Sequence, residues 1–207
     1  IADGPDETPD GPAPDPNVRP LYLEDELERL VSLNFELGQL CATRIDDVPA
    51  AIGAWGRVLL ARPSHREALI GIEDYLRHDS ADVRRGAAEL AEPGYEGYGR
   101  WSDRILALSI QIETSEDPAF KATQHERIAD IYLEELGMPE EAFGHYGALL
   151  ALAPAHEHAR ERLDTSASAL GTWPKLIELY EAVLPSTGEP GSELLTDYLF
   201  TLAHMFA

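Results

Sequence analysis

The feature that most constrains the fold of this chain is an internal repeat. Sliding the sequence by 91 residues lays residues 37–69 on residues 128–160 without a gap. The identical pairs are Ala51/Ala142, Gly53/Gly144, Gly56/Gly147, Leu59/Leu150, Pro63/Pro154, His65/His156 and Ala68/Ala159. Seven identities in 33 aligned positions exceed chance, so we expect the chain to be built from stacked copies of one unit.

A second, shorter match has an offset of 72 residues and pairs residues 99–101 with residues 171–173. The first copy therefore carries 19 more residues than the second, enough for an additional helix near residues 80–91. Residues 202–206 resemble the start of a third copy. Because that pattern stops in mid-period and residue 1 is not Met, we expect the sequence to be an excerpt of a longer chain.

Apolar residues from position 21 onward recur every three or four positions, and alternating β-branched runs are missing. This spacing predicts helices and no strands. Ser64 and Glu67 have the spacing of a capping box, and the pair Pro93-Gly94 is expected to break or kink its helix. The expected helices are roughly residues 21–43, 47–61, 64–78, 80–91, 101–113, 118–136, 139–152, 155–170, 173–184 and 192–207.

Each copy combines a small residue on its first helix with an aromatic residue on its second. The small residues are Gly38 and Ala129, and the aromatic residues are Trp55 and Tyr146. We expect the small residue to let the neighbouring helix approach while the ring fills the remaining gap. A helical hairpin of this kind cannot bury its apolar face alone, so it must stack on further copies.

These residues resemble the tetratricopeptide-repeat (TPR) superfamily, whose hairpin carries Trp, Leu, Gly and Tyr on its first helix and Ala, Phe, Ala and Pro on its second. The matching residues are Leu37, Gly38, Cys41, Ala51, Trp55, Val58 and Pro63 in one hairpin and Ile128, Ala129, Tyr132, Ala142, Tyr146, Leu149 and Pro154 in another. Trp173, Leu176 and Tyr180 look like the first helix of a third hairpin. The turn is one residue longer than the family's, and the offsets of 91 and 72 residues differ from its usual ~34.

The resemblance implies an all-α, TPR-like right-handed α-solenoid of antiparallel helix hairpins, with about ten helices. It also implies that partners bind the concave face, which the first helix of each hairpin lines. We expect this domain to span residues 21–207. Residues 1–20 are rich in Asp and Pro and almost free of apolar side chains, so we expect a flexible acidic linker there.

The charge of the chain argues against two classes of partner. Sixteen Lys and Arg against 38 Asp and Glu leave a formal net charge of −22, which repels nucleic-acid phosphates and anionic membrane surfaces. No apolar run reaches the ~18 residues of a membrane span. We therefore expect neither nucleic-acid binding nor direct membrane insertion, whereas cytoplasmic and exported locations stay open.

No catalytic group, cofactor or metal site is expected. A zinc hydrolase helix needs His-Glu-x-x-His, but Arg160 follows His156-Glu157-His158 where the second His would stand. Solvated or capping histidines are the preferred interpretation. Cys41 aligns with Tyr132 in the repeat and is expected to be a buried packing thiol. The sequence shows no pattern of an enzyme.

The candidate partner-binding residues are acidic. Glu126, Asp130 and Glu134 follow one another at i, i+4 and i+8 along one helix, and the resemblance would place Glu178 and Glu181 on the next matching helix. If this strip is a binding site, its charge favours a basic, Lys- or Arg-rich protein segment. The alternative is an ordinary solvated face.

We therefore expect a non-catalytic scaffold for protein–protein interactions. The alternative from a different class is a structural, self-associating segment whose solenoid ends stack chain on chain.

Overall fold

A computed structural model of the chain describes residues 21–205. These residues form ten α-helices and no strand. The helices are α1 (Leu21–Leu40), α2 (Val48–Ala61), α3 (Arg66–Glu73), α4 (Ala81–Gly97), α5 (Trp101–Thr114), α6 (Pro118–Asp130), α7 (Pro139–Leu152), α8 (Glu157–Leu170), α9 (Trp173–Val183) and α10 (Glu193–Met205). The linker predicted for residues 1–20 lies outside the described residues.

Short helical segments of a different pitch continue four of these helices. They are the π-helical turns η1 (Cys41–Ile45) after α1 and η3 (Ile131–Glu135) after α6, and the 3₁₀ turns η2 (Asp74–Arg77) after α3 and η4 (Leu184–Ser186) after α9. The predicted helix positions therefore agree with the structure to within a few residues at most ends.

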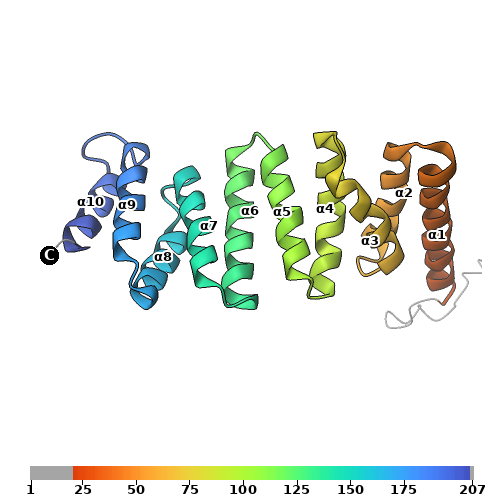
Figure 1. Ribbon diagram of the computed structural model, residues 1–207, viewed down its shortest axis with the longest axis horizontal. Helices are drawn as coiled ribbons and strands as arrows, with labels where there is room; N and C mark the ends of the chain where they lie inside the picture. Colours follow the sequence, from red (N-terminus) through yellow and green to blue (C-terminus); the bar gives the residue numbers. More distant parts are fainter. Residues whose placement is uncertain (1–20, 206–207) are drawn as a thin grey trace, which may run out of the picture.

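The helices stand side by side in one elongated row that follows the chain from α1 to α10 (Figure 1). Short connections join consecutive helices, so neighbours run antiparallel. This arrangement confirms the predicted all-α solenoid of antiparallel helix hairpins. Among the described helices, none combines the length and the apolar character needed to cross a membrane.

The backbone repeats the same bonds 91 residues apart. At the end of the first helix, the Asp47 N–H donates to the Cys41 carbonyl at 3.0 Å, and the Met138 N–H donates to the Tyr132 carbonyl at 2.7 Å. Both bonds span six residues and follow a π-helical turn. The repeat in the sequence is therefore a repeat of conformation.

A histidine caps the third helix of each copy. The Ala68 N–H donates to His65 Nδ1, and the Ala159 N–H donates to His156 Nδ1, both at 3.3 Å. The predicted capping box with Ser64 is wrong, because α3 begins one residue later than that motif requires. The capping role proposed for the histidines is confirmed for His156.

Trp55 on α2 is held between two glycines. A Cβ added to Gly38 on α1 would lie 2.5 Å from Trp55 Cδ1, and one added to Gly71 on α3 would lie 2.9 Å from Trp55 Cζ2. The predicted fit of a small residue against a ring is therefore confirmed, with a second glycine that the sequence did not indicate. The close fit leaves the buried Trp55 Nε1 without a hydrogen-bond partner.

Helix α4 is the counterpart of α9 rather than an insertion. A Cβ on Gly56 of α2 would lie 2.8 Å from Leu90 of α4, and one on Gly147 of α7 would lie 2.6 Å from Leu179 of α9. The expected additional helix is therefore wrong. Each copy holds five helices, and α5 matches α10 at the same offset of about 91 residues, although α4 has 17 residues against 11 in α9.

Helix α4 also continues through Pro93, where the sequence predicted a break or kink. Tyr95 on the following turn is buried, and Gly94 lies so close to the Pro63 carbonyl that a Cβ would be 2.7 Å from its oxygen. Burial of this turn against the α2–α3 connection compensates for the hydrogen bond that a proline cannot donate.

Five helices per copy is an odd number, so α6 runs antiparallel to its counterpart α1 (Figure 1). Two larger apolar cores fill the two halves of the row, and a small one, formed by Leu108, Ile128 and Ile131, joins them between α5 and α6. The junction between the copies therefore depends on few apolar contacts.

A buried carboxylate reinforces this junction. Glu92 on α4 accepts from Arg104 Nε on α5 at 2.5 Å and from Arg127 on α6 at 2.6 Å. Burial alone would raise the pKa of Glu92, but the hydrogen bonds and charges of Arg127 and Arg104 lower it below its ordinary value. Glu92 thus connects three helices through one ionised group.

We expect Gly38→Ala to destabilise the fold by about 1–3 kcal/mol, because the new methyl group would overlap the Trp55 ring. Gly144→Ala is the matched control, since a Cβ there meets open space on an exposed helical position. It should stabilise the protein by about 0.5–1 kcal/mol. Chemical denaturation of both variants measures the contrast, and equal effects would contradict the packing described.

We expect Glu92→Gln to cost about 2–3 kcal/mol, because two arginines lose a shared charged acceptor. Since the folded-state pKa of Glu92 is lowered, its contribution is present above pH ~4.5 and is lost as the pH falls further. Glu113→Gln breaks an exposed pair with Arg84 and should cost below about 1 kcal/mol. Urea denaturation at neutral pH compares the two variants.

Candidate functional site

The predicted acidic residues of α6 and η3 face α8, and two of them are paired with it. Glu126 Oε1 accepts from His158 Nδ1 at 3.1 Å, and Glu134 Oε1 accepts from Arg162 at 2.8 Å. His156 Nε2 also lies 3.6 Å from Glu126 Oε1. Two acids of this strip therefore have partners on α8, and one of these partners is an arginine.

The third predicted residue, Asp130, forms part of a repeated contact. The Tyr146 hydroxyl on α7 donates to Asp130 Oδ1 at 2.6 Å, and the Tyr180 hydroxyl on α9 donates to Asp164 Oδ1 on α8 at 2.9 Å. Both the aspartates and the tyrosines are 34 residues apart, the spacing of a TPR hairpin. Hairpin α8–α9 therefore repeats hairpin α6–α7.

This correspondence corrects the assignment of α9. Because Tyr180 occupies the place of Tyr146, α9 is the second helix of its hairpin, not the first helix of a third one. Glu178 and Glu181 are exposed on α9 and do not continue the row that begins at Glu126. The helix that matches α6 is α8.

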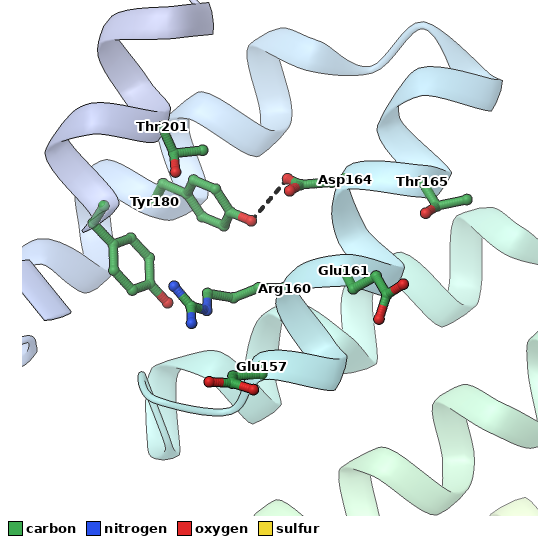
Figure 2. Close-up of a pocket in the computed structure, with 8 residues that line it drawn as sticks. Glu157, Arg160, Glu161, Asp164, Thr165, Tyr180 and Thr201 are labelled. Atoms are coloured by element: carbon green, nitrogen blue, oxygen red, sulfur yellow. Dashed lines mark hydrogen bonds between the residues drawn. The ribbon is translucent and has the colours of Figure 1, made fainter.

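Contacts between alternate helices define one surface, which we call the α6–α8–α10 face. Between α8 and α10 it opens into a groove of about 290 Å³. The lining residues are Glu157, Arg160, Glu161, Asp164, Thr165, Tyr180, Tyr198 and Thr201. Figure 2 shows Arg160 and Asp164 extending from one side of α8 toward Tyr180, with Glu161 and Thr165 farther from that ring.

Arg160 lies in this groove without a charged partner. Its guanidinium carbon lies 5.4 Å from the centre of the Tyr198 ring, a cation–π contact. Within residues 21–205 it forms no ion pair, and its buried Nε has no hydrogen-bond partner. The Arg160 guanidinium therefore lies at the groove without an ion pair to the described residues, while its Nε is buried and unpaired among them.

Asp164 lies one helical turn after Arg160. Burial raises the pKa of Asp164 above its ordinary value, although the hydrogen bond from Tyr180 and the charge of Arg160 act in the opposite direction. Burial likewise raises the pKa of Tyr180. A carboxylate that is desolvated at a surface groove gains from a cationic or hydrogen-bonding ligand.

Sequence reasoning missed Arg160 and Asp164 as site residues. The signal that could have found Asp164 is the 34-residue spacing of Asp130 with Asp164 and of Tyr146 with Tyr180. No comparable signal marks Arg160, because its importance depends on the absence of a partner in the folded chain.

The histidines at the start of α8 form hydrogen bonds through both ring nitrogens or through one of them. His158 Nε2 accepts from Arg162 Nε at 3.0 Å, so its Nδ1 carries the proton that is donated to Glu126. His156 Nδ1 accepts the capping bond, which leaves Nε2 as the protonated nitrogen.

In the described part of the chain, no three or more His, Cys, Asp or Glu side chains form a group that could hold a metal ion. Cys41 is buried, as the repeat register predicted.

A second pair of histidines connects α6 and α7. His125 Nδ1 and His145 Nδ1 are 3.1 Å apart, and the Tyr132 ring stacks on His145. Burial, together with the proximity of His125, lowers the pKa of His145 to about 4. Burial and the charge of Lys121 lower the pKa of His125. This pair is a neutral hydrogen bond at pH 7.

The fold and the groove define the class of this chain as a helical-repeat protein with a polar face. Among known proteins, no family model matches it and no curated protein matches it. Among solved structures it is similar to one described as "Crystal structure of MamA protein", with 16% sequence identity and a TM-score of 0.39. That match covers 76% of this chain and 92% of the other.

We expect the stability of the protein to fall between about pH 6.5 and pH 4 partly because of His145. Its folded-state pKa is lowered, so its stabilising effect is complete above the unfolded value and is lost as the pH drops. His145→Phe keeps a ring against Tyr132 but cannot titrate. Urea midpoints at pH 7 and pH 5 should therefore differ less for His145→Phe than for the unmodified chain, and an equal loss would contradict the assignment.

Proposed function

We propose that this chain is a non-catalytic scaffold for protein–protein interactions and that a basic segment of a partner protein binds the α6–α8–α10 face. The observation that carries the proposal is the groove between α8 and α10, where the Arg160 guanidinium and the desolvated Asp164 line one opening. Membership of the TPR superfamily, which the residue pattern resembles, is part of the same proposal.

The chemistry of the groove favours a peptide over a simple ion. A main-chain carbonyl of a bound segment could accept from the terminal N–H groups of Arg160, while a Lys or Arg side chain could reach Asp164 and Glu157. The buried Tyr198 and Tyr180 side chains line the groove beside both groups. Extended segments present carbonyls and side chains together, which suits such a mixed surface.

The net charge of −22 supports a basic partner, since long-range attraction raises the association rate of oppositely charged chains. Glu126, Asp130 and Glu134 lie on the same face, and we include them in the proposed surface. Asp130 and Glu134 also line a second groove, of about 240 Å³, together with Arg104 and Arg127. Because these acids have internal partners, we propose that they attract the segment and that the α8–α10 groove holds it.

The test compares fluorescently labelled Lys/Arg-rich and Glu-rich peptides of equal length, with binding measured by fluorescence anisotropy. The basic peptide should bind the unmodified chain more tightly and should lose affinity as salt rises. Replacing Glu157 and Asp164 together by Gln and Asn should weaken it at least about tenfold, the effect of removing roughly 1.4 kcal/mol.

A matched control removes two charges from α9 with Glu178→Gln and Glu181→Gln. This variant carries the same net charge as the groove variant but leaves the groove intact, so it should retain the affinity of the unmodified chain. Equal weakening by both variants would show that net charge alone attracts the peptide. In that case the groove is not the binding site.

A further inference from the structure

The first helix carries a long exposed apolar stripe. Six leucines of α1 are between 40% and 61% exposed: Leu23, Leu27, Leu30, Leu33, Leu37 and Leu40. Another side of α1 packs on the core, through Val31 and Phe35. Helix α1 is therefore apolar on two sides, and one of them has no cover within the described residues.

The spacing of the stripe is that of a helix–helix seam. Leu23, Leu30 and Leu37 recur every seven residues, and Leu33 and Leu40 occupy the positions three residues after Leu30 and Leu37. Apolar residues at positions a and d of successive heptads place a seam along one side of a helix, where a second helix can pack. Glu26 takes the remaining d position.

The second copy shows what covers this surface. Leu37 and Leu40 correspond to Ile128 and Ile131 of α6 and η3, which are fully buried or nearly so. Both isoleucines are covered by α5, through Leu108 and its neighbours. The surface that α1 exposes is therefore equivalent to one that a neighbouring helix covers in the second copy.

We propose that the leucine stripe of α1 binds the same stripe of a second copy, so that the two helices form an antiparallel pair about a two-fold axis. In an antiparallel pair, each a residue lies beside a d residue of the other helix. The register that places Leu30 beside Leu33 of the second copy also places Leu23 beside its Leu40, and Leu37 beside its Glu26.

Charge selects this register. In it, Arg29 at the edge of the seam faces Glu36 of the second copy, and the two-fold axis makes the same pair twice. Within residues 21–205 neither Arg29 nor Glu36 has an ion-pair partner, and both are exposed. The two intermolecular pairs would therefore use charges that the single chain leaves free.

The neighbouring arrangements are less favourable. Shifting the antiparallel register by one heptad in either direction places Glu36 against Glu36 of the second copy, or Arg29 against Arg29. A parallel pair would place Glu26 against Glu26 inside the seam. Like charges directly opposite each other are unfavourable, so one arrangement is preferred.

The available area suits a weak, specific dimer. The exposed parts of the six leucines amount to about three whole side chains, or roughly 500 Å² per chain and roughly 1,000 Å² for the pair, the lower end of specific interfaces. Residues 1–20 are a poor alternative cover, since their aliphatic side chains are limited to Ile1, Ala2, Ala13 and Val18.

The first experiment is sedimentation equilibrium between roughly 1 and 200 µM, where the mean mass should rise from 22.8 kDa toward twice that value. Leu30→Gln with Leu37→Gln should keep the protein monomeric throughout, with unchanged helical content by circular dichroism. Leu60→Gln, at an exposed leucine of α2, is the control and should dimerise like the unmodified chain.

The second experiment tests the register by exchanging charges. Arg29→Glu and Glu36→Arg should each weaken dimerisation at least about tenfold, because each variant places like charges opposite each other twice. Mixing the two variants should restore association as a heterodimer, in which both pairs are again of opposite sign. Arg77→Glu changes a remote exposed charge and should have no effect.

Three results would overturn the proposal. The first is a mass of 22.8 kDa at every concentration, which would leave the stripe for a helix of a different protein. The second is association that survives the double leucine substitution, which would place the contact elsewhere. The third is failure of the mixed charge variants to associate, which would exclude this register. The inference is independent of the proposed function, because it uses a different helix and a different readout.

Discussion

An aromatic ring packs between glycines on two neighbouring helices, and this contact sets the spacing of the helices in the solenoid. Trp55 fills the space between Gly38 and Gly71, so the separation of α1, α2 and α3 depends on the thickness of one indole ring. Dispersion contacts of this kind are individually small, but they are lost together when the fit is wrong. The unpaired indole N–H of Trp55 shows that the close fit outweighs the loss of a hydrogen bond.

The odd number of helices in each copy gives equivalent helices different surroundings. Helix α6 follows α5 and is covered by it, whereas its counterpart α1 stands at the beginning of the row. Residues at equivalent positions of the repeat therefore differ in burial: Leu37 is exposed, whereas Ile128 is fully buried. In a solenoid each unit contacts only its neighbours, so an end helix keeps an interface that interior helices use.

The polar face shows a similar division of roles. The Tyr146–Asp130 and Tyr180–Asp164 pairs are structural bonds that recur with the hairpin. Between η3 and α8, Glu134 is paired with Arg162. Between α8 and α10 the same kind of surface leaves Arg160 without an acceptor and Asp164 with a raised pKa. Groups held in an unfavourable state in an open groove are those that a ligand can stabilise most.

The helical class, the approximate helix positions and the register of the repeat could be predicted from the amino-acid sequence. These properties follow from local spacing: apolar residues every three or four positions, and a small residue such as Gly38 set against a ring such as Trp55. The side-chain contacts between helices could be found only in the folded structure. It assigned the cap of α3 to His65 and paired Glu126 with His158. It also carried α4 through Pro93, because burial of a distant surface offsets a local cost. Contacts between helices depend on the angle and distance at which the helices cross, and these cannot be read from the spacing of residues within one helix.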